Sequence, residues 1–170
     1  MAALSATLSR NKMRFYLLGE CAACMSASGP VDLSCQQRIW SMAEQLRQLA
    51  TCRDIVPGMN NLTAIFDPDQ HSGDQMLAVM EQQWKAAQGQ AYASRTLEIP
   101  VRYGGADGPD LSVVAEHAGM TTEEVIAAHS AAEYVVYFLG FQPGFAYMGG
   151  LPERLATPRR ADPRLKVPAG

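Results

Sequence analysis

The segment from Gly140 to Gly170 limits what this chain can fold into more than any other part of it. It holds five of the ten prolines and five of the fourteen glycines of the 170-residue chain, together with three aromatic residues and four arginines. Glycine reaches backbone conformations that other residues avoid, and proline fixes φ and lacks an amide donor. Flexible linkers are polar and contain few aromatic residues. The segment is therefore predicted to be an ordered, irregular loop with a basic rim, of the kind that lines a functional site.

Strand and helix patterns alternate along the chain before this segment. Short apolar runs predict strands at residues 14–18, 22–26, 52–56, 62–66, 96–103 and 133–139. Apolar residues at helical spacing predict helices at about 34–50, 73–87, 111–118 and 121–130. Thr96–Tyr103 alternates like a half-buried strand, whereas the continuous run in Glu133–Leu139 is typical of a strand buried on both faces. This order predicts an α+β fold with a mixed or antiparallel N-terminal sheet and helices on one face.

The helix boundaries are marked by capping residues. Asp32 or Ser34 can cap the first helix, in which Trp40 belongs to the apolar face and Gln36 to the polar face. Thr121-Thr-Glu-Glu124 is a capping box and opens the fourth helix.

Charge and sequence motifs exclude several function classes. Residues 1–12 lack the features of a signal peptide, so we expect a disordered leader. A net charge of −3 does not favour binding to nucleic acid or to an anionic membrane, which both attract basic surfaces. The helix-turn-helix-like segment 110–130 has no Lys or Arg for DNA contacts. A cytoplasmic protein is expected.

The cysteines and histidines do not predict a metal site. Cys21 and Cys24 are in a strand pattern, where positions three apart point to opposite faces and chelate poorly. We therefore expect structural, reduced thiols. The three histidines form no pair at metal-ligand spacing.

Several loop residues are candidates for binding or catalysis. Asn60 follows a Pro-Gly turn and either shapes a hairpin or offers its amide to a ligand. Asp110 either caps the helix that follows it or belongs to an anion-binding loop, and His129 is either a solvated helix-end residue or a site residue. In the C-terminal segment the candidates are Gly144, Phe145, Tyr147, Arg159, Arg160 and Arg164. The arginines suit carboxylate or phosphate groups, or else form a solvated rim.

The C-terminal motifs resemble those of a known family. They are F-L-G-F-Q-P-G-F-A-Y-M-G-G-L-P (Phe138–Pro152), T-P-R-R (Thr157–Arg160), P-R (Pro163–Arg164) and V-P-A-G (Val167–Gly170). Together with Val56–Thr63 and Pro100–Leu111 they resemble the family of the 5-oxoprolinase B subunit. That family also includes the KipI-type histidine-kinase inhibitors and the first subunit of allophanate hydrolase. The resemblance runs from about Met13 to the end of the chain.

The resemblance implies an enzyme component. It implies an N-terminal α/β domain, expected at 13–92, followed by a cyclophilin-like β-barrel. Residues 93–170 are expected to hold a connecting strand, helices and only the beginning of that barrel. It implies a complex with the A and C subunits of 5-oxoprolinase, which opens the ring of 5-oxoproline to give glutamate, driven by ATP. Arg159, Arg160 and His129 are then candidate catalytic residues, and Asn60, Gly144, Phe145, Tyr147, Arg164 and Asp110 are candidate substrate-binding residues.

The same resemblance leaves other functions open. No ATP-binding motif is present, so ATP is expected on a partner subunit or shared with one. The alternatives are a KipI-type inhibitor of a sensor histidine kinase and a component of another carboxyltransferase-like or allophanate-hydrolase-like amide enzyme.

Overall fold

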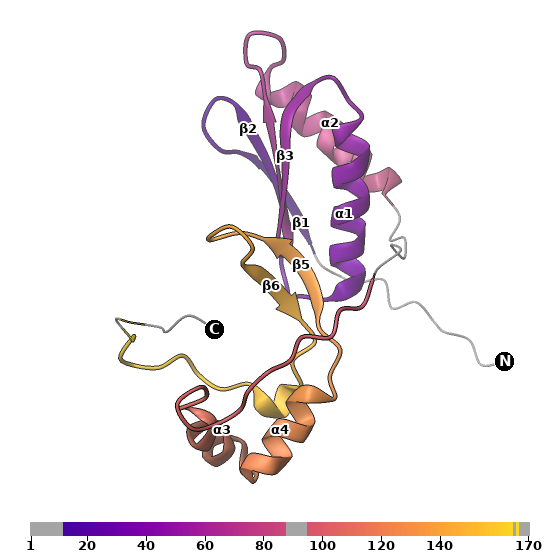
Figure 1. Cartoon of the computed structure of the whole chain (residues 1–170). Coiled ribbons are helices and arrows are strands. Elements are labelled where there is room, and N and C mark those ends of the chain that lie inside the picture. Colours follow the sequence, from indigo (N-terminus) through magenta and orange to yellow (C-terminus); the bar gives the residue numbers. More distant parts are fainter. Residues whose placement is uncertain (1–11, 88–94, 165, 167–170) are drawn as a thin grey trace, which may run out of the picture. The chain divides into compact units, whose positions relative to one another are not determined.

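The computed structural model describes residues 12–87, 95–164 and 166, and the chain is an α+β protein, as predicted (Figure 1). Apart from Lys12, the expected leader lies outside the described residues. The contacts of the chain divide it into two compact units, each of which is described by itself. The first unit consists of Met1–Arg95 and Val136–Gly149, and the second of Thr96–Val135 and Gly150–Gly170. Every helix within the described ranges is too short or too polar to cross a lipid bilayer.

The first unit contains a four-stranded antiparallel sheet in the order β1-β2-β4-β3. The strands are β1 (Met13–Leu17), β2 (Ala22–Ala27), β3 (Cys52–Gly58) and β4 (Asn61–Phe66). The register pairs Phe15 with Met25 and Met25 with Leu62, so one face carries a continuous apolar row. Of the two predicted sheet types, mixed or antiparallel, the structure has the antiparallel one.

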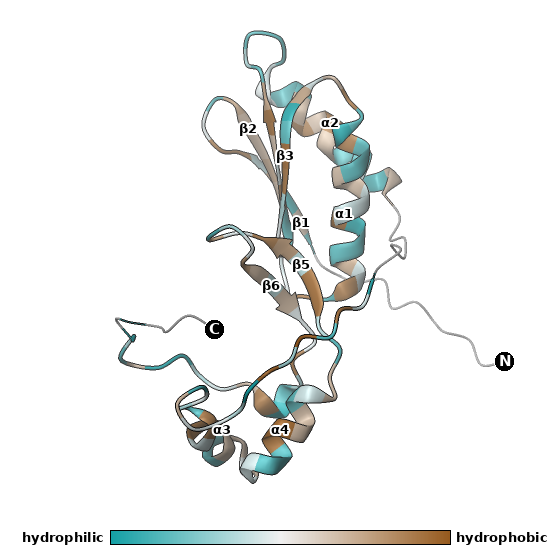
Figure 2. Ribbon diagram, viewed as in Figure 1, coloured by the Kyte–Doolittle hydropathy of each residue, from teal (hydrophilic) through white to brown (hydrophobic). Residues whose placement is uncertain are grey.

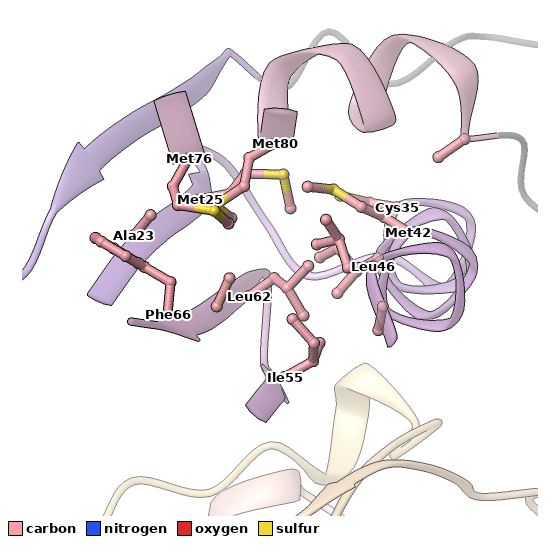
Figure 3. Close-up of a cluster of buried hydrophobic side chains, with 14 residues drawn as sticks. Ala23, Met25, Cys35, Met42, Leu46, Ile55, Leu62, Phe66, Met76 and Met80 are labelled. Carbon is pink, nitrogen blue, oxygen red and sulfur yellow. The ribbon is translucent and has the colours of Figure 1, made fainter. Parts of the chain in front are cut away.

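Two helices cover this apolar face of the sheet. They are α1 (Leu33–Arg47) and α2 (Gly73–Ala86). Asp32 caps α1 by accepting a hydrogen bond from the Cys35 amide, which decides between the two predicted caps. Ser72 and Gln75 form a capping box at the start of α2. Figure 3 shows the core between helices and sheet, in which Phe66, Met42, Leu46 and Met80 are fully buried.

Gln36 lies in this packed layer rather than on the solvent face, so its expected exposure is wrong. Its side chain is fully buried. Its amide donates to the Gly58 carbonyl (3.1 Å) and accepts from the Asn60 amide (3.2 Å). A buried amide is tolerated when both of its ends are paired. Gln36 thus joins α1 to the turn between β3 and β4.

A second, two-stranded sheet consists of β5 (Val135–Leu139) and β6 (Ala146–Gly149). Trp40 of α1 is half-buried, and its indole N–H donates to the Tyr137 carbonyl (2.8 Å). The expectation that this strand is buried on both faces is wrong, because Val136 is 46% exposed and Leu139 is 65% exposed. Figure 2 shows that β5 is a hydrophobic strand. A two-stranded sheet has too few neighbouring strands to cover both faces of such a strand.

The second unit is built from three short helical elements. They are α3 (Leu111–Ala118), α4 (Thr122–Ser130) and the 3-10 helix η1 (Glu153–Leu155). The predicted capping box of Thr121 and Glu124 is confirmed at the start of α4. A small apolar cluster of Ala115, Val125, Ala128 and Leu155 holds the three elements together.

The predicted strand at Thr96–Tyr103 is wrong. The segment is irregular, and no strand pairs with it within the part of the chain that the structure describes. Its alternating residues Leu97, Ile99 and Val101 are 64%, 75% and 52% exposed. Alternation of apolar and polar residues indicates a face to be covered, but a strand also requires a hydrogen-bonded neighbour.

Candidate functional site

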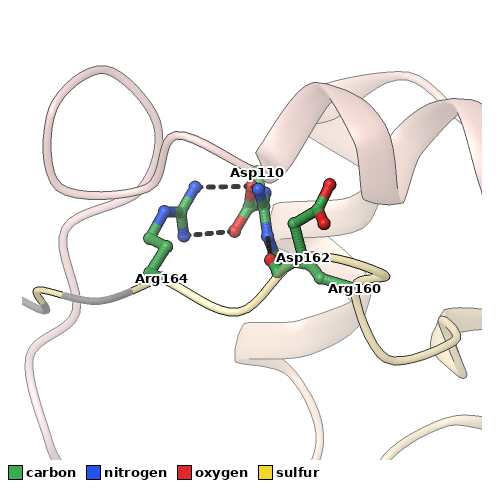
Figure 4. Close-up of polar contacts among 4 residues, drawn as sticks. All are labelled: Asp110, Arg160, Asp162 and Arg164. Carbon is green, nitrogen blue, oxygen red and sulfur yellow. Dashed lines mark hydrogen bonds and ion pairs between the residues drawn. The ribbon is translucent and has the colours of Figure 1, made fainter.

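The strongest polar cluster of the second unit joins Asp110 to Arg160 and Arg164 (Figure 4). Arg164 binds the carboxylate with both ends of its guanidinium fork, Nη1 to Oδ2 at 2.6 Å and Nη2 to Oδ1 at 2.7 Å. Arg160 adds a third bond from Nη1 to Oδ1 at 2.6 Å. Charge-assisted, bidentate bonds of this length are the geometry by which arginine recognises carboxylates. The structure thus brings together three of the residues that the sequence singled out.

The loop before α3 fixes the position of Asp110. The Gly108 amide donates to the Gly104 carbonyl (2.9 Å), which closes a tight turn. A side chain at Gly108 would fall 2.5 Å from the Gly104 nitrogen, and Gly104 has a φ of +75°, so this loop requires glycine at both positions. The Asp110 carbonyl then accepts the Val114 amide and begins the helix.

The arginines come from the segment that follows η1. Leu155 is buried against α3 and α4 and anchors this segment to the second unit. Beyond it, the Arg160 Nε donates to the Asp162 carbonyl at 3.3 Å, a local contact that orients the Arg160 side chain. The proline at 163 restricts the backbone between the two arginines. The two guanidinium groups therefore converge on one carboxylate from a short stretch of chain.

Asp110 does not act as a helix cap, so that interpretation of the sequence is wrong. It stands at the N-cap position of α3, but its side chain makes no capping hydrogen bond. Both carboxylate oxygens instead accept from arginines, because two cations compete better for the carboxylate than neutral amides do. The hydrogen bond from Arg164 is the main cause that lowers the pKa of the Asp110 carboxyl below its ordinary value.

Arg159 does not belong to this cluster. It is exposed, and it makes no hydrogen bond or ion pair with any residue that the structure describes. Its predicted catalytic role stays a prediction.

His129 lies in a separate aromatic group at the end of α4. The Tyr103 hydroxyl is 2.8 Å from His129 Nδ1, and the Tyr134 hydroxyl donates to the His129 carbonyl at 3.2 Å. The two tyrosine rings lie 5.7 Å and 5.2 Å from the imidazole. Burial raises the pKa of the Tyr134 phenol, and the neighbouring Tyr103 adds to the effect. No local pattern predicts these two partners, since they lie on different segments from α4.

Gly144, Phe145 and Tyr147 belong to the hairpin of β5 and β6 in the first unit. Gly144 has a φ of +81°, and the Phe145 amide donates to the Gln142 carbonyl, which is the pattern of a type II turn with proline at its second position. Phe145 packs edge-on against Tyr147 at 5.2 Å, and Tyr147 stacks on Phe138 at 4.4 Å. The result is a partly exposed aromatic ladder.

Phe141 extends this ladder and is a feature that sequence reasoning missed. It contacts Phe145 edge-on at 5.5 Å and is 84% exposed. Its φ of +66° is rare for a bulky side chain. Only the backbone conformation reveals this, because an apolar residue in a glycine-rich stretch predicts nothing about its own φ.

Asn60 occupies the turn between β3 and β4, with a φ of +56°. Its side-chain amide donates to the Gly29 carbonyl (3.3 Å), and its Oδ1 is buried without a hydrogen-bond partner among the described residues. The residue is 8% exposed. Asn60 therefore has a clear role in shaping the hairpin, and its predicted role in substrate binding stays a prediction.

The candidate residues thus lie in two groups, one in each compact unit. Asn60, Gly144, Phe145 and Tyr147 belong to the first unit. Asp110, His129, Arg159, Arg160 and Arg164 belong to the second. Among the described residues, no group of three or more histidine, cysteine or acidic side chains is arranged to hold a metal ion.

Comparison with known proteins defines the class of this chain. Residues 13–170 match the family described as carboxyltransferase domain, subdomain C and D, and the chain belongs to that family. The motif-bearing hairpin and the arginine segment both lie within the matched residues.

Named relatives define the branch of the family. The chain is 47% identical over 159 residues to the B subunit of 5-oxoprolinase from Escherichia coli O157:H7, covering 94% of this chain and 73% of that protein. It is 42% identical over 158 residues to the corresponding 5-oxoprolinase protein of Haemophilus influenzae, covering 93% and 74%. These relatives place the chain in the branch of the 5-oxoprolinase B subunit, as the motifs predicted.

A solved structure agrees with the fold. The crystal structure of TTHA0988 superposes with a TM-score of 0.68 at 31% sequence identity, covering 93% of this chain. The chain spans only 29% of the length of that structure's chain. The similarity therefore extends over nearly all of this chain and a limited part of the other.

Proposed function

We propose that this chain is part of an ATP-dependent 5-oxoprolinase complex, which hydrolyses 5-oxo-L-proline to L-glutamate. The observation that carries the proposal is the 47% identity over 94% of the chain to a protein named as the B subunit of 5-oxoprolinase. The partners we propose are the A and C subunits of the same complex, in the cytoplasm. The chain works as an enzyme component only within that assembly.

The substrate has one feature that the second unit is suited to bind. 5-Oxoproline carries a carboxylate beside its lactam ring, and Arg160 and Arg164 already hold a carboxylate through three charge-assisted bonds. Holding the substrate through this remote group orients the lactam for reaction. In this proposal Arg160 and Arg164 bind the carboxylate, and Arg159 and His129 remain the candidates for acting on the lactam.

The first unit carries the other candidate substrate-binding residues. Gly144 leaves the turn of the β5–β6 hairpin without a side chain, and Phe145 and Tyr147 add aromatic surface next to it. Asn60 holds the β3–β4 turn together with Gln36.

We further propose that the hairpin is the start of a cyclophilin-like barrel, and that residues 13–92 and 93–170 are the two domains of the chain. A two-stranded sheet with exposed apolar residues supports the barrel proposal, because such a sheet needs further strands to cover it.

The loop before α3 does not fit a site for the phosphates of ATP. The loop Gly104–Gly108 leads into α3, but it contains no lysine and neither does the first turn of the helix. Asp110 also places a carboxylate at the helix N-terminus, where a phosphate would have to bind. We therefore assign ATP to a partner subunit, or to a site shared with one, and derive no step of the reaction through it.

The direct test is the formation of glutamate from 5-oxoproline by this chain mixed with the candidate A and C subunits. We expect 5-oxoproline-dependent ATP hydrolysis in the three-component mixture, and none when any component is left out. Arg159→Ala should reduce the rate of an assembled complex, whereas Arg154→Ala, an exposed arginine outside the ion-pair cluster, should not. A complex that elutes as one species but forms no glutamate would contradict the proposal.

A further inference from the structure

The Asp110 cluster resembles a binding site in which part of the protein takes the place of the ligand. Three charge-assisted hydrogen bonds of 2.6–2.7 Å join one carboxylate to two guanidinium groups. A free carboxylate bound in a two-arginine site would make the same contacts. We propose that Arg160 and Arg164 form a carboxylate-binding cradle, and that Asp110 is its internal occupant and is displaced when a small carboxylate binds. The identity of the ligand as 5-oxoproline rests on the proposed function.

The solvent exposure of this cluster indicates whether Asp110 can be displaced from the arginines or is a permanent structural partner. The side chains of Arg160, Arg164 and Asp110 are 52%, 38% and 35% exposed. Ion pairs that water reaches contribute little to stability, because the charges are already well solvated when they are apart. A dissolved carboxylate can therefore exchange with Asp110 at little energetic cost. A buried pair of the same geometry would not allow this exchange.

The contacts that hold Asp110 and the arginine segment in place also favour a binding site over a purely structural ion pair. The turn closed by Gly104 and Gly108 fixes the backbone next to Asp110, and Leu155 anchors the segment that carries the arginines. Both of these supports are independent of the ion pairs. Arg160 also keeps its contact with the Asp162 carbonyl when Asp110 turns away from the arginines.

The Asp110 carboxyl is charged at neutral pH, as the substrate carboxylate is, and the two arginines lower its pKa further. Two carboxylates then compete for one cradle. The apparent affinity for the ligand equals the intrinsic affinity multiplied by the fraction of time during which the cradle is free. If Asp110 occupies it for about nine-tenths of the time, its removal should raise the apparent affinity by roughly tenfold.

The test measures binding to this chain alone, without ATP or the other proteins of the complex. 5-Oxoproline is titrated at constant ionic strength into the wild type, Asp110→Asn and Asp107→Asn, and backbone amide shifts are followed by NMR. We expect Asp110→Asn to bind roughly tenfold more tightly than the wild type. Asp107→Asn, a charge-matched control in the same loop, should bind like the wild type. Arg164→Ala in the Asp110→Asn background should abolish the gain.

A second ligand tests which chemical group the cradle recognises. 2-Pyrrolidinone has the same lactam ring without the carboxylate, and its binding should not change between the wild type and Asp110→Asn. Equal or weaker binding of 5-oxoproline by Asp110→Asn would overturn the proposal and leave Asp110 as a brace that positions the arginines. An equal gain in Asp107→Asn, or for 2-pyrrolidinone, would overturn it too. Absence of glutamate formation in the reconstituted mixture would instead contradict only the proposed function.

Discussion

Replacing Gln36 by leucine tests the role of the buried amide that supports the β3–β4 turn. Gln36 is fully buried, and its two ends pair with the Gly58 carbonyl and the Asn60 amide. Gln36→Leu keeps a side chain of similar size but removes both hydrogen bonds. The Asn60 amide is then left unpaired in a buried position, at a residue whose φ is already positive. We expect a clear loss of stability and a loosened turn.

The expected loss follows from the two backbone groups that lose the Gln36 side chain as a hydrogen-bond partner. An orphaned buried backbone group costs about 1–3 kcal/mol. The Asn60 amide should cost an amount in this range, and the partly buried Gly58 carbonyl costs less because water reaches it. Leucine recovers part of the loss, since an apolar side chain is easier to desolvate than an amide. The free energy of unfolding should therefore fall by about 2 kcal/mol.

Urea unfolding measures this change. With an m-value of about 1–3 kcal/mol per molar urea, the midpoint should fall by roughly 1 M. Amide exchange at Asn60 should become faster at the same time. Gln37→Leu is the matched control, because this neighbour is half-buried and its side chain makes no hydrogen bond within the described residues. A midpoint for Gln36→Leu equal to that of Gln37→Leu would refute the reasoning.

Three further perturbations test the turn, the aromatic group and the ion pairs. Gly144→Ala should lower stability by about 1 kcal/mol in urea unfolding, because alanine is strained at a φ of +81°, and Gly144→Asn should lose less; equal losses would contradict this. Tyr103→Phe removes the 2.8 Å contact to His129, so the imidazole ¹⁵N shifts should change and stability should fall by about 1 kcal/mol; unchanged shifts would argue against the contact in solution. The pKa of the Asp110 carboxyl is lowered on folding, so its exposed ion pairs make a small contribution to stability above a pH of about 4, which is lost as the pH falls through the lowered pKa. The difference in urea midpoint between wild type and Asp110→Asn should therefore close in acid, and a difference that persists at the lowest pH would refute this.

Three of the wrong predictions about local structure have a common physical cause. Thr96–Tyr103 does alternate, but a strand also depends on a neighbour that no local pattern specifies. Asp110 has the position of a helix cap, yet arginines 50 and 54 residues away compete for its carboxylate. The strand at 133–139 has the composition of a buried strand, but its exposure is set by how many strands lie beside it.

The sequence by itself determined the elements whose signals are local. Helical spacing and the capping box at Thr121 determined the helices, and the motifs around Phe138–Pro152 determined the family. These signals act within a few residues of one another, so they can be interpreted without knowing the fold. Only the tertiary structure decided that Gln36 is buried and that Asp110 meets two arginines. The partners of such groups are distant in sequence, and the energy of a polar side chain depends on which groups folding brings to it.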